Sequence, residues 1–228
     1  MKDHSKPTKG VSAPRPAYHT TRNPVTPSGR GFRAKFCSRK NRRMIRCESL
    51  LEFDALFLME FARGILSFEE QPVSITYRLN GRARRYTPDF GIHWADGRRS
   101  FVEIKPAQKL AEPEVTEKFW EVERFFESCG DQFFILSDQQ IRRPIRLEQI
   151  RRLLNHLVPN PVPAHQLRQM LPATGDVSIA AMCASGIDRQ TVTQLLANRT
   201  LTCDLDSTIC EDTKLRLFEE ADDVQLFI

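Results

Sequence analysis

Asp89, Glu103 and Lys105 are the residues whose types and spacing predict chemistry most directly. Side chains alternate between the two faces of a strand, so Glu103 and Lys105 share one face while Val102 and Ile104 point into the core. Asp89 begins the preceding strand, and a hairpin between the two strands brings its carboxylate within reach of the other two groups. Two carboxylates and an ammonium group should therefore converge at one spot on a sheet.

Paired carboxylate oxygens suit a hard divalent cation, so Mg²⁺, or Mn²⁺ in its place, is the expected metal. A bound metal polarises a phosphoryl oxygen and lowers the pKa of a bound water. Lys105 can orient that water or stabilise the charge that develops in the transition state. The combination predicts metal-dependent hydrolysis of a phosphodiester. The tripeptide from Glu103 to Lys105, taken alone, would favour a surface ion pair.

Glu52 is a third carboxylate of interest because of its apolar surroundings. It lies in a helix predicted from Ser49 to Ala62, which Gly64 should stop. A buried, unpaired carboxylate is costly, so Glu52 requires a partner or a metal. Ser49 followed three residues later by Glu52 also resembles a capping box, and this second role stays open.

Turn signals and hydrophobic periodicity predict the elements that must position these residues. Asn80-Gly81 is the strongest short hairpin signal, and residues 95–98 predict a second hairpin. A helix over residues 114–128 carries an apolar stripe and precedes a short buried strand. The expected strands cover residues 73–79, 82–87, 90–94, 100–105 and 133–136. The predicted core is α/β, in the order helix, antiparallel strands, helix, strand.

This order of elements, with Pro88-Asp89 and Glu103-x-Lys105 separated by 13 residues, resembles the PD-(D/E)xK nuclease superfamily. Four blocks carry a closer resemblance, to the TnsA endonuclease subunit of heteromeric cut-and-paste transposases. The blocks are Ser49-Leu50-Leu51-Glu52-Phe53-Asp54-Ala55, Phe68-Glu69-Glu70-Gln71-Pro72, Tyr86-Thr87-Pro88-Asp89-Phe90 and Val102-Glu103-Ile104-Lys105-Pro106. The resemblance covers the nuclease domain well and the C-terminal third only in general character.

The resemblance implies a restriction-endonuclease-like fold and an endonuclease that nicks one strand, at the 5′ ends, at each transposon end. The family's catalytic Glu, Asp and Lys fall on Glu52, Asp89 and Lys105, and Glu103 stands where the family often has Gln. Asp89 and Glu103 would hold Mg²⁺ with the carbonyl of Ile104, and Glu52 would complete the metal shell or hold its waters. The implied partners are transposon-end DNA, a DDE-type transposase and an AAA+ ATPase regulator.

Several further candidates keep two interpretations each. Gln71 fits either a contact with the metal site or a turn. On the following helix either Glu121 or Glu123 could reach the metal site: a solvated face is favoured for Glu121, and Glu123 stays a candidate because it flanks the Val122 stripe. Arg82, Arg84 and Arg85 fit either phosphate binding or a basic hairpin tip. Two other functions also stay open: a stand-alone restriction or repair nuclease, and a non-catalytic DNA-binding adaptor.

The chain divides into four predicted segments. They are a basic, largely extended arm (1–47), a nuclease domain (48–141), a helical winged-helix-like domain (142–210) and an acidic apolar tail (211–228). Residues 32–47 fit either a short strand pair or an extended segment. In the third segment, helices are expected over residues 145–157, 164–171, 178–184 and 188–197, with a wing strand over 201–205.

Charge is distributed unevenly over these segments. Residues 1–46 hold 13 Lys or Arg and one acid, which favours a polyanion partner such as DNA. The tail combines acids with large apolar residues, so it is expected to order on a protein surface. The resemblance to the TnsA family implies that this surface belongs to the regulatory ATPase. The alternative is that the tail packs on the chain's own helical domain.

Composition narrows the location of the protein. The chain is 40% apolar and 28% charged, and it has no apolar run near the roughly 20 residues that span a bilayer. No membrane segment and no secretory signal are expected. Six scattered cysteines without a Cys-x-x-Cys pair predict reduced thiols of an intracellular protein, cytoplasmic and nucleoid-associated.

Deleting residues 1–30 should weaken DNA binding and flatten its dependence on salt. Lys and Arg neutralise phosphates and release counterions irrespective of base sequence. The measurement is the slope of log K against log salt for the full and shortened chains. An unchanged slope would show that the arm makes no phosphate contacts.

Overall fold

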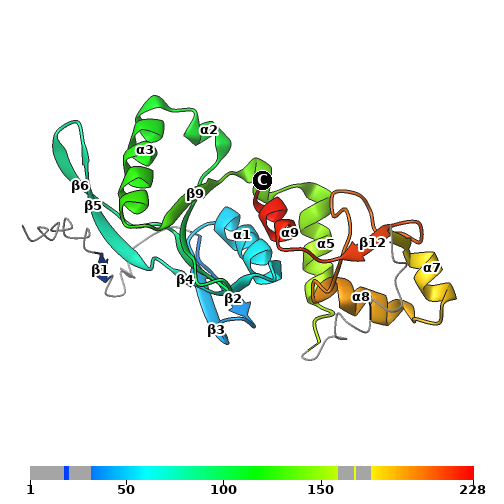
Figure 1. The fold of residues 1–228 in the computed structure, drawn as a ribbon. Coiled ribbons are helices and arrows are strands. Elements are labelled where there is room, and N and C mark those ends of the chain that lie inside the picture. The colour runs from blue at the N-terminus through cyan, green and yellow to red at the C-terminus, as the bar shows by residue number, and fades with distance from the viewer. Residues whose placement is uncertain (1–17, 21–31, 159–166, 168–175) are drawn as a thin grey trace, which may run out of the picture.

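A four-stranded mixed sheet forms the centre of the N-terminal part of the protein (Figure 1). The computed structural model describes residues 18–20, 32–158, 167 and 176–228. The sheet has the order β4-β7-β8-β9, in which β9 is parallel to β8 and the other pairs are antiparallel. Its strands are β4 (Ile65–Glu70), β7 (Phe90–Trp94), β8 (Arg99–Ile104) and β9 (Gln132–Leu136).

Helix α1 (Leu50–Phe61) covers one face of this sheet, and α3 (Pro113–Ser128) covers the other (Figure 1). Strand β8 sends Val102 into the core shared with α1 and Phe101 onto Phe126 of α3, with ring centroids 4.3 Å apart. Because both faces are covered, residues 100–104 are all buried. Helix α3 is the crossover to the parallel strand β9, preceded by the short α2 (Ala107–Leu110). The predicted α/β core is confirmed, with the predicted elements in the expected order along the chain. Strand β4 was not predicted, and the predicted strands 73–79 and 82–87 lie outside the central sheet.

A two-stranded ribbon leaves this core. It consists of β5 (Val73–Leu79) and β6 (Arg82–Tyr86), joined by the predicted Asn80-Gly81 turn. Both turn residues have positive φ, 52° and 74°, the geometry of a type I′ hairpin. The short strand β1 (His19–Thr20) pairs with the free edge of β5. The ribbon is one end of the molecule in Figure 1.

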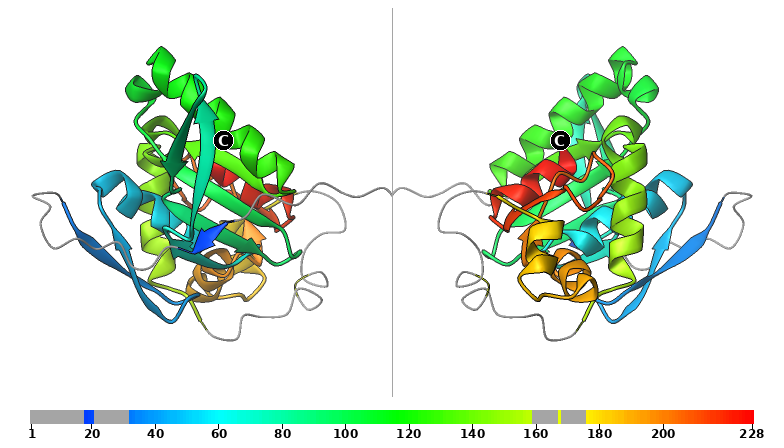
Figure 2. Two further views of the ribbon diagram at one scale, coloured as in Figure 1. Left: turned by 90° about the vertical axis from the view of Figure 1, so that its left-hand side faces the viewer. Right: turned by 90° about the vertical axis from the view of Figure 1, so that its right-hand side faces the viewer.

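The segment 32–47 forms the strand pair that was one of its two predicted alternatives. Strands β2 (Ala34–Ser38) and β3 (Arg43–Cys47) are antiparallel and lie beside α1 (Figure 2). Phe36 and Ile45 are buried, and the Phe36 ring lies edge-on against Phe57 of α1 at 5.1 Å. Apolar residues at alternate positions need a covered face, so this end of the arm is folded on the nuclease core and is not extended.

The C-terminal part is winged-helix-like, as predicted. Three short strands form a sheet of order β10-β12-β11 beside a helical pair whose turn contains Gly186 at φ +96°. Its elements are α4 (Asp138–Ile141), α5 (Pro144–Leu154), β10 (Val177–Ser178), α7 (Ile179–Ala184), α8 (Arg189–Ala197), β11 (Leu201–Thr202) and β12 (Lys214–Leu217). The helix expected over residues 164–171 lies outside the described residues except for Leu167, which is buried. Among the helices described, none is long and apolar enough to span a membrane.

The acidic tail packs on its own chain, so the expectation of a segment that orders on a partner is wrong. Strand β12 completes the winged-helix sheet, and α9 (Ala221–Val224) with the 3₁₀ turn η1 (Gln225–Phe227) follows it. Leu215, Leu226 and Phe227 are buried. The apolar residues of the tail pack against the winged-helix sheet and against the nuclease domain around Trp94. The rings of Trp94 and Phe227 lie 6.3 Å apart.

Asp223 joins the two parts of the molecule. Its carboxylate accepts hydrogen bonds from the main-chain N–H groups of Arg63, at 3.1 Å, and Gly64, just after α1. It also pairs with Arg199 at 3.2 Å, and both side chains are almost completely buried. The Arg199 guanidinium lies over the rings of Phe61 and Phe218. One carboxylate therefore connects the C-terminal turn, the winged-helix domain and the end of α1.

Replacing Asp223 with Ala should lower the free energy of unfolding by about 3 kcal/mol or more, because it leaves the Arg199 charge buried without its partner. The measurement is urea unfolding followed by circular dichroism. Glu220→Ala is the matched control, since Glu220 is an exposed carboxylate three residues away. Equal loss of stability in the two variants would contradict the assigned role of Asp223.

Candidate active site

Asp89 lies where β7 begins, and its position is fixed by the main chain of the neighbouring strand. Register pairs Phe90 with Val102, so the residue before β7 meets the end of β8. The Asp89 carboxylate accepts a hydrogen bond from the N–H of Ile104 at 2.7 Å. The main-chain carbonyl of Asp89 accepts another from the N–H of Gln71 at 2.8 Å. The carboxylate is therefore held at the end of the sheet from which Lys105 leaves.

Glu103 is a buried carboxylate with two side-chain donors. One oxygen accepts a hydrogen bond from the Tyr86 hydroxyl at 2.6 Å, and the other lies 3.1 Å from the Lys105 ammonium. The Glu103 side chain is 6% exposed, so the alternative of a surface ion pair with Lys105 does not describe it. The structure brings Asp89, Glu103 and Lys105 to one end of β7 and β8, as the strand alternation predicted.

Burial and like charge act together on Asp89. Removal from water raises the pKa of its carboxyl to about 8, and the negative charge of Glu103 adds to the rise. The N–H of Ile104 and the charge of Lys105 oppose this rise without cancelling it. Two carboxylates that are both charged are therefore unfavourable here unless a further positive charge is present.

Glu52 contributes to the same electrostatic environment from the first turn of α1. Its N–H donates to the Ser49 hydroxyl at 3.0 Å, and its carboxylate accepts from the N–H of Glu48 at 2.8 Å. Burial raises the pKa of Glu52, and Glu103 raises it further, while the charge of Glu52 raises that of Asp89. The helix-capping role and proximity to the other carboxylates therefore occur together, although the bonded N–H belongs to Glu48 and not to the cap residue Ser49.

The carboxylates partly fit the expected metal. Over the described part of the chain, no three His, Cys, Asp or Glu side chains are close enough together to hold an ion. Asp89 and Glu103 nevertheless supply hard oxygen donors in a buried place where a cation would offset their repulsion. The residues present therefore suit a two-carboxylate Mg²⁺ or Mn²⁺ site, with Glu52 nearby.

Tyr86 and Lys118 also belong to the site, and the sequence did not single them out for it. The Lys118 ammonium lies over the rings of Tyr86 and Phe119, at 4.7 and 4.4 Å. Burial lowers the pKa of Lys118, whereas the charge of Glu103 raises it. Lys118 directly precedes Phe119 of the apolar stripe, which was the available signal. Helical periodicity could place it at the edge of the buried face but could not say that this edge meets β6.

The remaining candidates are placed as follows. Gln71 occupies the turn between β4 and β5 with φ +46°, and its N–H bond to Asp89 gives it a turn role beside the site. Glu123 is exposed on α3. A role for either as a metal ligand stays a prediction.

The mixed central sheet with a helix on each face defines the class of fold, an α/β domain consistent with a restriction-endonuclease-like core. Residues 63–138 match a family model described as TnsA-like endonuclease N terminal. The matched segment contains Asp89, Glu103 and Lys105, and Glu52 precedes it. No curated protein matches the chain. The chain therefore carries a TnsA-like endonuclease domain, and the predicted resemblance is confirmed over this segment.

Raising the pH from about 4 to about 8 should cost the wild-type protein stability relative to Asp89→Asn. In the unfolded chain Asp89 ionises near pH 3.9, whereas in the folded protein it keeps its proton until about pH 8. The resulting stabilisation is fully present below pH 4 and is lost as the pH rises through 8. Chemical denaturation of both proteins without divalent cations should show a gap that widens by on the order of a few kcal/mol. If the stability of the two proteins changed with pH in parallel, the raised pKa of the buried Asp89 carboxyl would be contradicted.

Proposed function

We propose that this protein is a Mg²⁺-dependent DNA endonuclease that nicks one strand, at the 5′ ends, at transposon ends during cut-and-paste transposition. The observation that carries the proposal is the convergence of Asp89, Glu103 and Lys105 at one end of β7 and β8, inside the segment that matches the TnsA-like family. Buried carboxylates next to a lysine suit phosphodiester hydrolysis better than a structural role, because a structural ion pair needs only one carboxylate.

Each residue has a distinct task in this proposal. Asp89 and Glu103, with the Ile104 carbonyl, would hold Mg²⁺, which when bound polarises the scissile phosphate and activates water. Glu52 would complete the metal shell or hold its waters. Lys105, whose ammonium is one hydrogen bond from Glu103, would position the attacking water. The expected products carry a 5′-phosphate and a 3′-hydroxyl.

Two side chains beyond the predicted set support this arrangement. The Tyr86 hydroxyl fixes one oxygen of Glu103 and so limits the rotation of that carboxylate. Lys118 keeps a positive charge beside the site without an ion pair to any described residue, which suits the phosphate of an incoming strand. Because the Lys118 ammonium forms no ion pair with a described residue, it can pair with a phosphate of the substrate.

The proposed partners follow from the TnsA-like domain. A DDE-type transposase would cut and join the second strand, and an AAA+ ATPase would regulate the assembly. The DNA partner is also supported by the excess of Lys and Arg in residues 1–46. The proposed setting is the prokaryotic cytoplasm, at the nucleoid.

Asp89→Ala should reduce nicking at transposon ends by more than about 100-fold, since loss of even an outer-shell contact at a metal site costs 10–100-fold. The assay combines this protein with candidate transposase and ATPase on end-containing DNA and maps the cut strand. Asp96→Ala is the matched control, because Asp96 is an exposed carboxylate in the turn between β7 and β8. It should leave nicking unchanged.

Two results would contradict the proposal. A folded Asp89→Ala protein that nicks at the wild-type rate would refute the site assignment. Cutting of both strands by the wild-type chain alone, without transposase, would identify a stand-alone nuclease. Circular dichroism and thermal melting of each variant establish that it is folded.

A further inference from the structure

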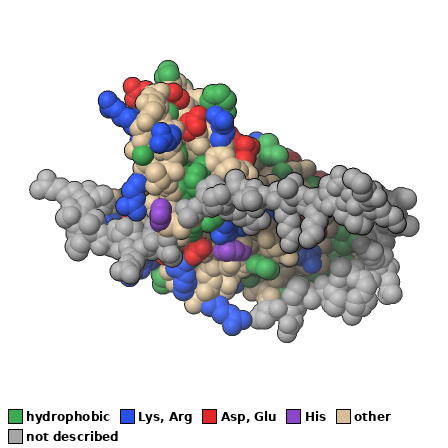
Figure 3. Space-filling model, turned by 60° about the vertical axis from the view of Figure 1, so that its left-hand side comes forward, with side chains coloured by type: hydrophobic (Ala, Val, Ile, Leu, Met, Phe, Trp, Pro, Cys, Tyr) green, Lys and Arg blue, Asp and Glu red, His purple; other side chains and the backbone are tan. Residues whose placement is uncertain are grey.

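Four arginines concentrate positive charge on the β5–β6 ribbon. Arg78, Arg82, Arg84 and Arg85 are all exposed, and none forms an ion pair with any residue that the structure describes. By contrast, arginines on neighbouring elements are neutralised, as in the pairs Arg98–Asp96 and Arg99–Asp131. Figure 3, turned so that the ribbon side comes forward, shows Lys and Arg side chains standing out from this face. The ribbon thus carries positive charge that forms no ion pair within the described part of the chain.

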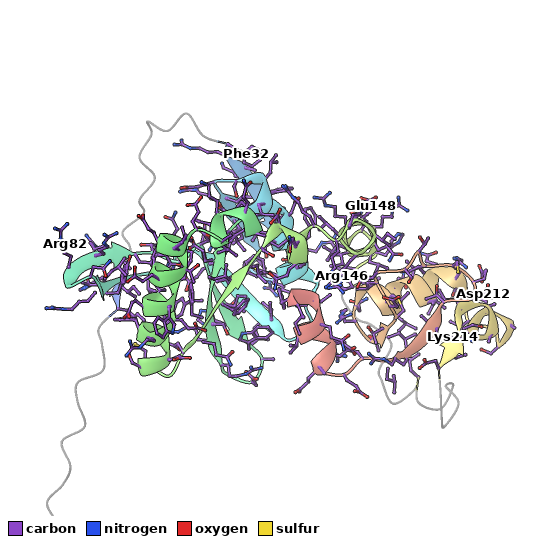
Figure 4. All side chains as sticks on the ribbon, turned by 90° about the horizontal axis from the view of Figure 1, so that it is seen from above. Phe32, Arg82, Arg146, Glu148, Asp212 and Lys214 are labelled. Atoms are coloured by element: carbon purple, nitrogen blue, oxygen red, sulfur yellow. The ribbon has the colours of Figure 1, made fainter. Side chains whose placement is uncertain are left out.

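Strand register places these arginines on both faces of the ribbon. Arg84 lies opposite Tyr77 and Arg82 opposite Leu79, on the face that also carries buried Tyr86. Arg85 lies opposite Thr76 and Arg78 opposite Ala83, on the other face. Opposed residues of an antiparallel pair point to the same side of the sheet. Figure 4 shows Arg82 at the outer end of the ribbon, directed away from the body.

The base of the ribbon is fixed to the candidate active site. Tyr86 ends β6, and its hydroxyl donates to Glu103 at 2.6 Å. From Tyr86 to Arg82 the strand advances four residues, or about 13 Å at roughly 3.3 Å per residue. Duplex DNA advances about 3.4 Å per base pair, so the same distance covers about four base pairs. The arginines are therefore spaced to reach phosphates on one side of a strand that is held at the carboxylates.

The basic arm joins the same ribbon. Strand β1 pairs with β5 through His19 and Ser74, directly after Tyr18. The Tyr18 ring packs on Phe101 at 5.7 Å, and the guanidinium of Arg99 lies over it at 4.8 Å. The chain that precedes this anchor holds four Lys or Arg among residues 1–17. The described anchor, Tyr18 with β1, therefore lies at the start of β5, and the sequence that leads into it is basic.

We propose that the β5–β6 ribbon binds the phosphate backbone of the DNA duplex beside the cleavage site, over about four base pairs from the scissile phosphate. One face of the ribbon packs on α3 and β1 pairs with its edge, so the exposed arginines are available along its outer side and at its tip. Placed there, they can contact phosphates along one side of a duplex. These contacts position the duplex and do not select its base sequence. The inference rests on the proposed function only in that duplex DNA is the substrate.

The test measures DNA binding in an Asp89→Ala background, so that it does not depend on cleavage. Arg82→Ala/Arg84→Ala and Arg78→Ala/Arg85→Ala each remove one face, while Arg98→Ala/Arg152→Ala removes the same charge from exposed sites elsewhere. Each ribbon pair should reduce the slope of log K against log salt by about 2, equally on transposon-end and scrambled duplexes. Arg82→Lys/Arg84→Lys should keep the slope. In the protein with an intact ribbon, ethylation of phosphates within about four base pairs of the cut should weaken binding. In the two ribbon variants to Ala, ethylation of these phosphates should no longer have an effect.

Specific outcomes overturn the inference. One such outcome is that the ribbon variants to Ala show the same salt slope as the Arg98→Ala/Arg152→Ala control. Another is that they lose ethylation interference only at phosphates more than about four base pairs from the cut. Either result would show that the ribbon does not contact the duplex beside the cleavage site. Normal DNA binding with lost association to transposase would identify the ribbon as a protein-binding surface instead. Failure of the proposed function would give a different result. A protein that binds DNA through the ribbon but nicks in no assembly would still show the expected dependence of binding on salt. Thermal melting of each variant separates lost contacts from lost folding.

Discussion

The buried carboxylate of Glu103 is the charge on which the arrangement around it depends. A carboxylate removed from water needs donors, and here they come from two directions, the Tyr86 hydroxyl on β6 and the Lys105 ammonium after β8. The first bond ties the ribbon to the sheet, although the two belong to separate hydrogen-bonded sheets. The same stretch of β8 presents the N–H that holds Asp89. One buried negative charge therefore sets the relation between sheet, ribbon and candidate site.

The surroundings of this charge balance two requirements that conflict. Asp89 beside Glu103 makes the site unfavourable for two negative charges, which is a cost to the folded protein. Lys105 lowers that cost, and Lys118, held between aromatic rings, adds positive charge without neutralising either carboxylate through a direct bond. Under the proposed function, a cation and an anionic strand would supply the compensation that the described residues lack.

Sequence patterns predicted the local part of this structure and missed the contacts between distant segments. Asn80-Gly81 specified the ribbon, and strand alternation placed Glu103 and Lys105 on one side, because both are consequences of backbone geometry over a few residues. The contact of Lys118 with Tyr86 joins residues 32 positions apart, and nothing in a helical period identifies the strand that a helix edge will meet. The tail was misassigned for the same reason. Its apolar residues showed that a partner surface was needed, but not that β10, β11 and the region around Trp94 of the same chain would supply it.

The contact between Asp223 and Arg63 spans 160 positions of sequence, and this separation orders the events of folding. During synthesis the central sheet has all its strands once Leu136 has been added, whereas Asp223, whose carboxylate accepts a hydrogen bond from Arg63 just after α1, is added 87 residues later. At about 5–20 residues per second the interval is roughly 4–17 s. The cluster between the sheet and α3, which includes Phe101, Phe126 and Phe133, therefore has time to form before the C-terminal part of the chain arrives. The end of α1, together with Trp94, stays exposed to the ribosome's surroundings and to chaperones until the last part of the chain covers it.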